Sequence, residues 1–231
     1  MIFSLFRDTG RRRARCAKIL VSVLLPTALA ACNGLFHSDA RPEQVYYLRA
    51  KAAPVSEAGR TVVDASVRVG RPVAAPGLDS SQIVLLQADH RMSFFSASRW
   101  PASVPDVVEM LAIETLRASG SWTSVENSAS PFPSDYLLQI SVRRFEAEYS
   151  EGGGPPEVHV VLDCLIGRRE GRDVVASFVA EGSSVATTNK LSAVTAAFDT
   201  AANSALGSLS EQARAAVRAS LKRKSEGHQR P

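Results

Sequence analysis

Apolar and polar positions alternate with a period of two in several stretches of the chain. Between 61 and 70 every second residue is apolar, which predicts a strand whose buried face is formed by Val63, Ala65, Val67 and Val69. The run IVLLQ at 83–87 is apolar almost throughout and predicts a strand covered on both faces. Asp89 and His90 predict a turn into a return strand over 92–100, and the aromatic and β-branched run 44–50 predicts the first strand.

Longer alternating stretches occupy the second half of the chain. After a short predicted strand at 122–125, apolar residues alternate over 136–150, 158–168 and 174–186, and Tyr136, Leu138, Ile140 and Val142 share one face of the first of these segments. The connections EGGGPPE and REGRD are rich in glycine, proline and charged residues, so they predict loops. Three long strands joined by such loops predict an antiparallel meander.

Two stretches change to a helical period of three and four residues. Ser103 and Asp106 have the spacing of a capping box ahead of a helix at 104–119, which Gly120 ends. The segment 189–221 carries one apolar stripe and predicts a long amphipathic helix.

These elements together predict an α+β fold. A single domain over 44–221 would pack its two main helices on a mixed or antiparallel sheet. The charged residues 222–231 that follow predict a disordered tail.

The N-terminal segment predicts secretion. A basic stretch precedes the apolar run 19–31, which has 13 residues and includes Pro26. A transmembrane helix needs roughly 20 apolar residues, so this run is too short to span a bilayer. A basic segment, a short apolar segment and a small-residue cleavage site are typical of a signal peptide, here 1–31 with cleavage after Ala31.

The residues around the cleavage site resemble the lipobox of bacterial lipoproteins, with the sequence Leu29-Ala30-Ala31-Cys32. The resemblance implies that Cys32 is acylated, and two or more acyl chains anchor a domain stably to a bilayer. The alternative is an ordinary signal peptide with an incidental cysteine. Since Asn33 stands where aspartate would signal inner-membrane retention, the resemblance implies the periplasmic face of the outer membrane. Residues 32–43 then comprise the acylated cysteine and a polar linker, whose 11 residues, 33–43, average roughly 18 Å end to end as a flexible coil.

Composition changes once the signal peptide is removed. The whole chain has 27 basic and 23 acidic residues; without the six basic residues and one acidic residue of the signal peptide, 21 and 22 remain, a net charge of −1. The basic character of the whole chain therefore gives no reason to expect nucleic-acid binding. With Cys16 removed and Cys32 acylated, Cys164 has no partner for an intramolecular disulfide and is expected to be a small buried residue.

In this order of elements the chain resembles the ABC-type transport auxiliary lipoproteins, the PqiC-like family, over roughly 44–220. Four local matches support the resemblance: Tyr47-Leu48, the stretch VRVGRPVAAPGLDSSQIVL, the pair Arg99-Trp100, and Tyr136-Leu137 ahead of a strand that ends at Phe145. Two departures are Pro101 after Arg99-Trp100, where the family often has an acidic residue after Trp-Ala, and the lack of a tryptophan near the end of the last helix.

The resemblance implies both a fold and a role. The fold would be a curved sheet with two helices packed on it. The role would be that of a lipoprotein beside an ABC transporter that moves lipids between the two membranes. It would dock the transporter's periplasmic protein, built from mammalian-cell-entry (MCE) domains, at the outer membrane.

Three residues are candidates for contact with that partner: Tyr47, Arg99 and Trp100. Trp100 and Trp122 are also predicted, as the more frequent alternative, to pack inside the domain beside the first helix. The alanine-rich face of the last helix predicts either a homo-oligomer contact or, more commonly, packing on the chain's own sheet.

The sequence contains no motif of a nucleophilic, zinc-dependent or nucleotide-binding site. Asp89 and His90 fall in a predicted turn. Glu146 and Glu148 share a strand face as a catalytic carboxylate pair would, but Arg143 and Arg144 beside them favour a solvated face. We therefore expect neither an enzyme nor a metal or other cofactor.

Two other functions remain open at this point. One is a general envelope-maintenance lipoprotein that binds peptidoglycan or an assembly machine. The other is a domain that itself carries lipid in an apolar cavity between the sheet and the helices.

Overall fold

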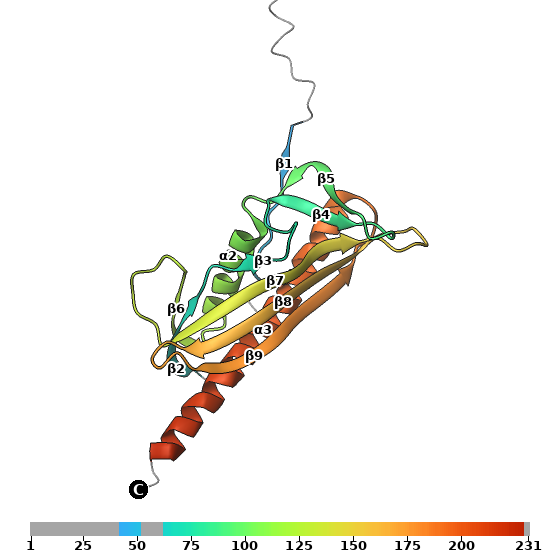
Figure 1. The fold of residues 1–231 in the computed structure, drawn as a ribbon. Coiled ribbons are helices and arrows are strands. Elements are labelled where there is room, and N and C mark those ends of the chain that lie inside the picture. The colour runs from blue at the N-terminus through green and yellow to red at the C-terminus, as the bar shows by residue number, and fades with distance from the viewer. Residues whose placement is uncertain (1–41, 52–61, 229–231) are drawn as a thin grey trace, which may run out of the picture. The chain divides into compact units, whose positions relative to one another are not determined.

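The computed structural model describes residues 42–51 and 62–228 (Figure 1). The contacts within the chain divide it into Met1–Pro42 and Glu43–Pro231, and all elements described here belong to the second part. The predicted signal peptide, Ala31, Cys32 and most of the linker lie outside the described residues. Of the helices in the described part, none has the length and apolar character that a membrane span requires.

Within residues 42–51 and 62–228, one mixed sheet of nine strands carries two helices. The strands are β1 (Gln44–Val45), β2 (Val63–Val69), β3 (Val73–Ala74), β4 (Gln82–Leu86), β5 (Met92–Arg99), β6 (Trp122–Glu126), β7 (Tyr136–Glu148), β8 (Glu157–Arg168) and β9 (Val174–Val185). The helices are α2 (Val104–Ala118) and α3 (Leu191–His228). The predicted α+β fold class, a sheet with two helices packed on it, is confirmed.

Strand β7 organises the sheet. On one side it pairs antiparallel with β8, which pairs antiparallel with β9, so the predicted meander is confirmed (Figure 1). On its other side β7 pairs in parallel with β2, β3 and β4, each along a different stretch of its length. Strand β6 then pairs with β2, and β5 and β1 extend the sheet beyond β4.

A β-bulge divides β7. The register against β8 shifts between Val142 and Arg144. Before the shift the even-numbered residues from Tyr136 to Val142 face the core as predicted; after it Phe145 and Ala147 take that face. One extra residue in a strand reverses the side to which its neighbours point, which explains this exchange.

Helix α3 covers one face of the meander by packing along β8 and β9 (Figure 1). Its apolar stripe is buried. On its alanine-rich face Ala197, Ala201, Ala202 and Ala205 lie in the core, whereas Ala196 is exposed. The approach to β9 is close, since a Cβ at Gly182 would lie 2.2 Å from the Ala201 carbonyl oxygen. The alanine-rich face therefore packs on the chain's own sheet.

Helix α2 begins as predicted. Ser103 is its N-cap, with the Asp106 amide donating to the Ser103 hydroxyl oxygen, and Gly120 has a φ of 57° just beyond its end. Helix α3 ends later than predicted. The expected disordered tail is wrong for 222–228, because lysine, arginine and glutamate favour helix and Lys222 pairs with Glu226 one turn away.

The first predicted strand is shorter than expected. Only Gln44 and Val45 pair with β5, and the backbone then leaves the sheet for α3. The Arg49 amide donates to Asp199 at 3.0 Å, and the Lys51 amide donates to Asn203 at 2.6 Å. Since α3 side chains satisfy these backbone groups, the segment after Tyr46 needs no strand partner.

Candidate functional site

Two of the three predicted contact residues lie where the chain enters the domain. The Tyr46 amide donates to the Arg99 carbonyl oxygen at 2.9 Å, and the Arg99 side chain forms an ion pair of 2.6 Å with Glu43. Tyr47, which follows Tyr46, is 68% exposed. Tyr47 and Arg99 are therefore close in space and open to solvent, and their role as partner contacts stays a prediction.

Trp100 is not on the surface. Its side chain is 0% exposed and packs edge-on against Phe145 and Phe198, with ring centroids 5.9 and 5.2 Å away. The expectation of a direct partner contact is wrong for this residue, and the inward-packing alternative holds for Trp100 and also for the buried Trp122. Edge-to-face aromatic packing stabilises the core, so Trp100 joins β5 to β7 and α3.

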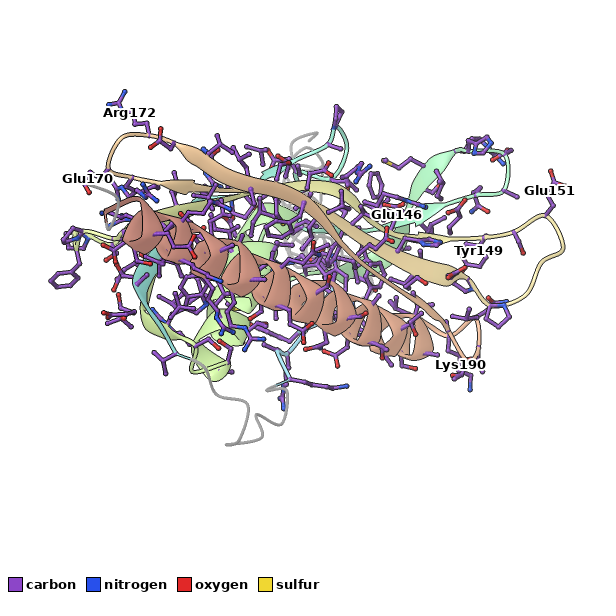
Figure 2. The ribbon with its side chains drawn as sticks, turned by 90° about the horizontal axis from the view of Figure 1, so that it is seen from below. Glu146, Tyr149, Glu151, Glu170, Arg172 and Lys190 are labelled. Carbon is purple, nitrogen blue, oxygen red and sulfur yellow. The ribbon has the colours of Figure 1, made fainter. Side chains whose placement is uncertain are left out.

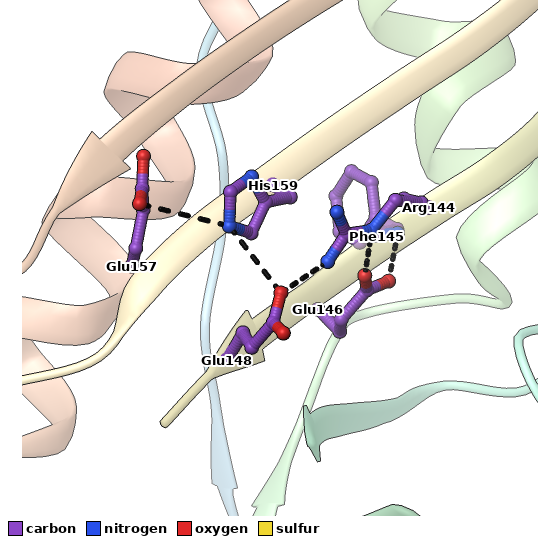
Figure 3. Close-up of polar contacts among 6 residues, drawn as sticks. All are labelled: Arg144, Phe145, Glu146, Glu148, Glu157 and His159. Atoms are coloured by element: carbon purple, nitrogen blue, oxygen red, sulfur yellow. Dashed lines mark hydrogen bonds and ion pairs between the residues drawn. The ribbon is translucent and has the colours of Figure 1, made fainter. Parts of the chain in front are cut away.

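The two glutamates of β7 form a cluster with their neighbours on β8 (Figure 3). Arg144 lies between them, with 2.5 Å from its Nε to Glu146 and 2.5 Å from its Nη2 to Glu148. His159 Nε2 lies 3.5 Å from Glu148 and 3.8 Å from Glu157. The predicted solvated face is wrong for Glu146, which is only 7% exposed.

The β-bulge explains why Glu146 is buried. The Phe145 amide donates at 2.7 Å to the Glu146 carboxylate, whose other oxygen binds Arg144. A bulge leaves backbone groups without ladder partners, so this carboxylate satisfies an amide that the strand pairing does not. The cluster therefore stabilises the backbone of the bulge.

The ionisation of these groups fits a structural role. Burial disfavours the charged guanidinium of Arg144, but its hydrogen bonds to Glu146 and Glu148 outweigh that effect and raise its pKa. Burial raises the pKa of the Cys164 thiol to about 12, so this cysteine is the expected buried, unreactive residue. Within the described ranges, no group of three His, Cys, Asp or Glu side chains is placed to hold a metal ion.

A second region stands out for its exposure. The connection between β6 and β7, residues 127–135, is here named the proline loop. It presents Phe132, which is 66% exposed, between Pro131 and Pro133. Proline fixes its own φ and restricts the residue before it to extended conformations, so the backbone at Phe132 has little freedom.

The proline loop is anchored from β2. The Arg68 guanidinium donates to the carbonyl oxygens of Ser130, at 2.6 Å, and of Phe132. The Asp135 carboxylate accepts from the backbone amide and hydroxyl of Ser66 at 2.7 and 2.6 Å. These two hydrogen bonds from Ser66, the hydroxyl bond first, lower the pKa of Asp135 below its ordinary value.

The turn between β8 and β9, residues 169–173, lies against this loop. The Arg169 amide donates to the Asp135 carbonyl oxygen at 2.9 Å. The Arg168 side chain donates to Ser220 of α3 at 2.8 Å. The proline loop and residues 169–173 are named together the anchor surface. A depression of about 410 Å³ on the open face of the sheet adjoins it, with Leu137, Leu165 and Val174 among its lining residues.

Phe132 and Arg68 were not among the residues predicted from the sequence. The sequence does contain a signal, because an aromatic residue between two prolines in a polar loop has little chance of packing inside. The partner of Arg68 carried no signal, since β2 and the proline loop are far apart along the chain.

The family model of the ABC-type transport auxiliary lipoprotein component matches residues 46–214, most of the chain. The chain belongs to this family. The predicted resemblance is thus confirmed, and the protein is an auxiliary lipoprotein component of ABC-type transport. The family is described by that auxiliary role and not by a catalytic activity. A comparison of the sequence with curated proteins gives no match.

Solved structures agree with the fold. Protein XCC0632 from Xanthomonas campestris, of the DUF330 family, is similar with a TM-score of 0.69 and 23% identity, covering 78% of this chain and 99% of that one. An uncharacterized protein is similar with a TM-score of 0.58 and 11% identity, covering 74% of this chain and 99% of that one. At these identities the similarity concerns the fold alone.

Proposed function

We propose that this protein is anchored by acyl chains on Cys32 to the periplasmic face of the outer membrane. There it docks the periplasmic MCE-domain protein of an ABC transporter that moves phospholipids between the two membranes. The observation that carries the proposal is the family match over residues 46–214, which makes the chain an accessory of a transporter.

The entry of the chain into the domain supports a tethered role. Glu43 pairs with Arg99, and residues 49–51 are held by Asp199 and Asn203 of α3. The chain is therefore held from Glu43, the last residue of the predicted linker, onward. A linker of 11 residues, 33–43, with an expected span of roughly 18 Å keeps the domain within reach of the membrane surface.

The interior favours docking over lipid carriage by the domain itself. The layer between the sheet and α3 is filled by buried side chains, among them Phe198, Leu209 and Val217 of α3. The 410 Å³ depression lies on the opposite, open face of the sheet. These observations favour a domain that binds a transporter protein at its surface over one that binds a lipid inside.

The test is affinity purification of the lipidated protein from crosslinked envelopes, with identification of captured proteins by mass spectrometry. Recovery of the MCE-domain protein is the expected result. Cys32→Ala is the matched control, because it removes the anchor and leaves the folded domain unchanged. Recovery of only cell-wall or assembly proteins, or full complementation by the soluble Cys32→Ala form, would overturn the proposal.

A further inference from the structure

We infer that the anchor surface is a docking site for a protein that presents an apolar pocket rimmed by acidic and basic groups, and that Phe132 fills this pocket. The inference deepens the proposed function, and rests on it in taking the MCE-domain protein as that partner. Figure 2 shows the residues Glu170 and Arg172 of this surface at one end of the meander, and Glu151 and Tyr149 at the other.

The first argument is preorganisation. Phe132 is exposed, yet its backbone is restricted by two prolines and held by Arg68 through the Ser130 and Phe132 carbonyl oxygens. Loops usually lose conformational freedom when they bind, and this one has already lost much of it. Rigid, exposed aromatic side chains are typical anchors of protein interfaces.

Hydrogen bonds also hold both ends of the proline loop. Next to β6, the Ser130 hydroxyl donates to Glu126 at 2.6 Å and the Ser128 amide donates to Glu109 of α2 at 2.9 Å. Next to β7, Asp135 is bound by Ser66. These contacts fix the position of Phe132 relative to both the sheet and α2.

The charges around Phe132 define the partner's chemistry. Arg169 adjoins the loop through the hydrogen bond of its amide to Asp135, and Arg172 lies in the same turn; neither forms an ion pair within the part of the chain that the structure describes. Their positive charges are complementary to acidic groups on a partner. Glu170 lies between them and Asp173 follows Arg172, and these two carboxylates are complementary to basic groups. Because alternating acids and bases repel and attract an anionic membrane about equally, this pattern favours a protein over a lipid surface.

The location suits a partner that approaches from the periplasm. The chain enters the domain beside Asp199 of α3, whereas the anchor surface meets α3 at Ser220 through Arg168. These two α3 residues are separated by roughly 32 Å of helix at about 1.5 Å per residue. Because Arg168 is the residue before the 169–173 turn, the anchor surface is well removed from the point of attachment to the linker.

The decisive experiment measures the dissociation constant between the full-length lipoprotein in detergent and the purified MCE-domain protein. Phe132→Ala is compared with Phe94→Ala, a matched control because Phe94 is 42% exposed on β5. We expect Phe132→Ala to weaken binding about 30-fold or more, as for an interface hot spot, and Phe94→Ala to leave it unchanged. Equal affinities for the two variants would overturn the inference.

Failure of the proposed function gives a different result. If the wild-type protein does not bind the MCE-domain protein, the proposed function fails. The docking surface is then tested separately, with a photo-crosslinking residue placed at position 132 of the protein in cells. A crosslink to one defined protein, mapped to a charged and apolar peptide, supports the surface. Crosslinks only to phospholipid, or none above those of the same residue at position 94, overturn it.

Discussion

The two ends of the β7–β8–β9 meander use charge in opposite ways. At the end near the β7–β8 connection, Arg144 is bound on both sides by Glu146 and Glu148, and these groups hold the bulge of β7 (Figure 3). At the end near residues 169–173, Arg68 fixes the backbone of the proline loop while Arg169, Arg172 and Phe132 face solvent. The first end uses its polar groups to stabilise the fold, and the second offers them to a partner.

This difference teaches how to separate stability from binding in this family. A cluster of titratable side chains is the usual first candidate for a functional site. Here Glu146 of that cluster binds the chain's own backbone at the Phe145 amide. Phe132, by contrast, is an exposed aromatic residue on a rigid loop and does not pack in the core. Substitutions at the two ends should therefore affect different measurements.

The largest effect on stability is expected at the bulge. Glu146→Ala removes the acceptor of the Phe145 amide and one partner of Arg144, so we expect the free energy of unfolding to fall by about 2–3 kcal/mol. Glu148→Ala, at a more exposed position, should cost about 0.5 kcal/mol. Denaturant unfolding checks both, and equal losses would contradict the structural role of Glu146. Neither variant should weaken partner binding.

A smaller loss is expected at Arg68. Arg68→Met keeps an unbranched apolar stem but removes the hydrogen bonds to Ser130 and Phe132, which should cost about 1–2 kcal/mol of stability. Because the loop that holds Phe132 is released, partner binding should also weaken, although Phe132 itself is unchanged. A variant that loses stability and keeps full affinity would show that the fixed loop does not matter for binding.

The smallest stability effect is expected at Asp135 and depends on pH. Its pKa is lowered in the folded protein, so its contribution is present above the ordinary value of 3.8 and is lost as the pH falls through the lower folded value. Asp135→Asn should therefore reduce stability by less than about 1 kcal/mol at pH 7, since this site is exposed. Below about pH 3.8 the difference in the free energy of unfolding between Asp135→Asn and the wild type should disappear, as measured by denaturation at several pH values. A constant difference down to pH 2 would assign the effect to something other than this carboxylate.

The elements that could be predicted from the sequence are those whose signal is local. The alternation from Val63 to Val69 and the Ser103 capping box depend on neighbouring residues, and the structure confirms both. The bulge also had a signal, because core residues Val142 and Phe145 are spaced by three instead of two. The parallel pairing of β2, β3 and β4 with β7 depends on distant partners and has no such signal.

The candidate site residues also differ in how far the sequence could identify them. Tyr47 and Arg99 are predicted as contact residues because they match family positions, and both are accessible. Trp100 matched equally well but is buried, since a sequence pattern does not distinguish a residue that binds a partner from one that holds the core. Phe132 had a local signal in its two flanking prolines, but the hydrogen bonds from Arg68 that hold its loop join distant parts of the chain and had none.

The most direct test of the account compares single charge reversals at the two ends of the meander. Arg172→Glu lies on the anchor surface, and Lys190→Glu lies at the opposite end, at an equally exposed position (Figure 2). The measurement is the dissociation constant for the purified MCE-domain protein at low and physiological salt. We predict that Arg172→Glu weakens binding about fivefold or more, with a smaller difference at higher salt, and that Lys190→Glu leaves binding unchanged. Equal effects of the two reversals, or a larger effect of Lys190→Glu, would contradict the assignment of docking to the anchor surface.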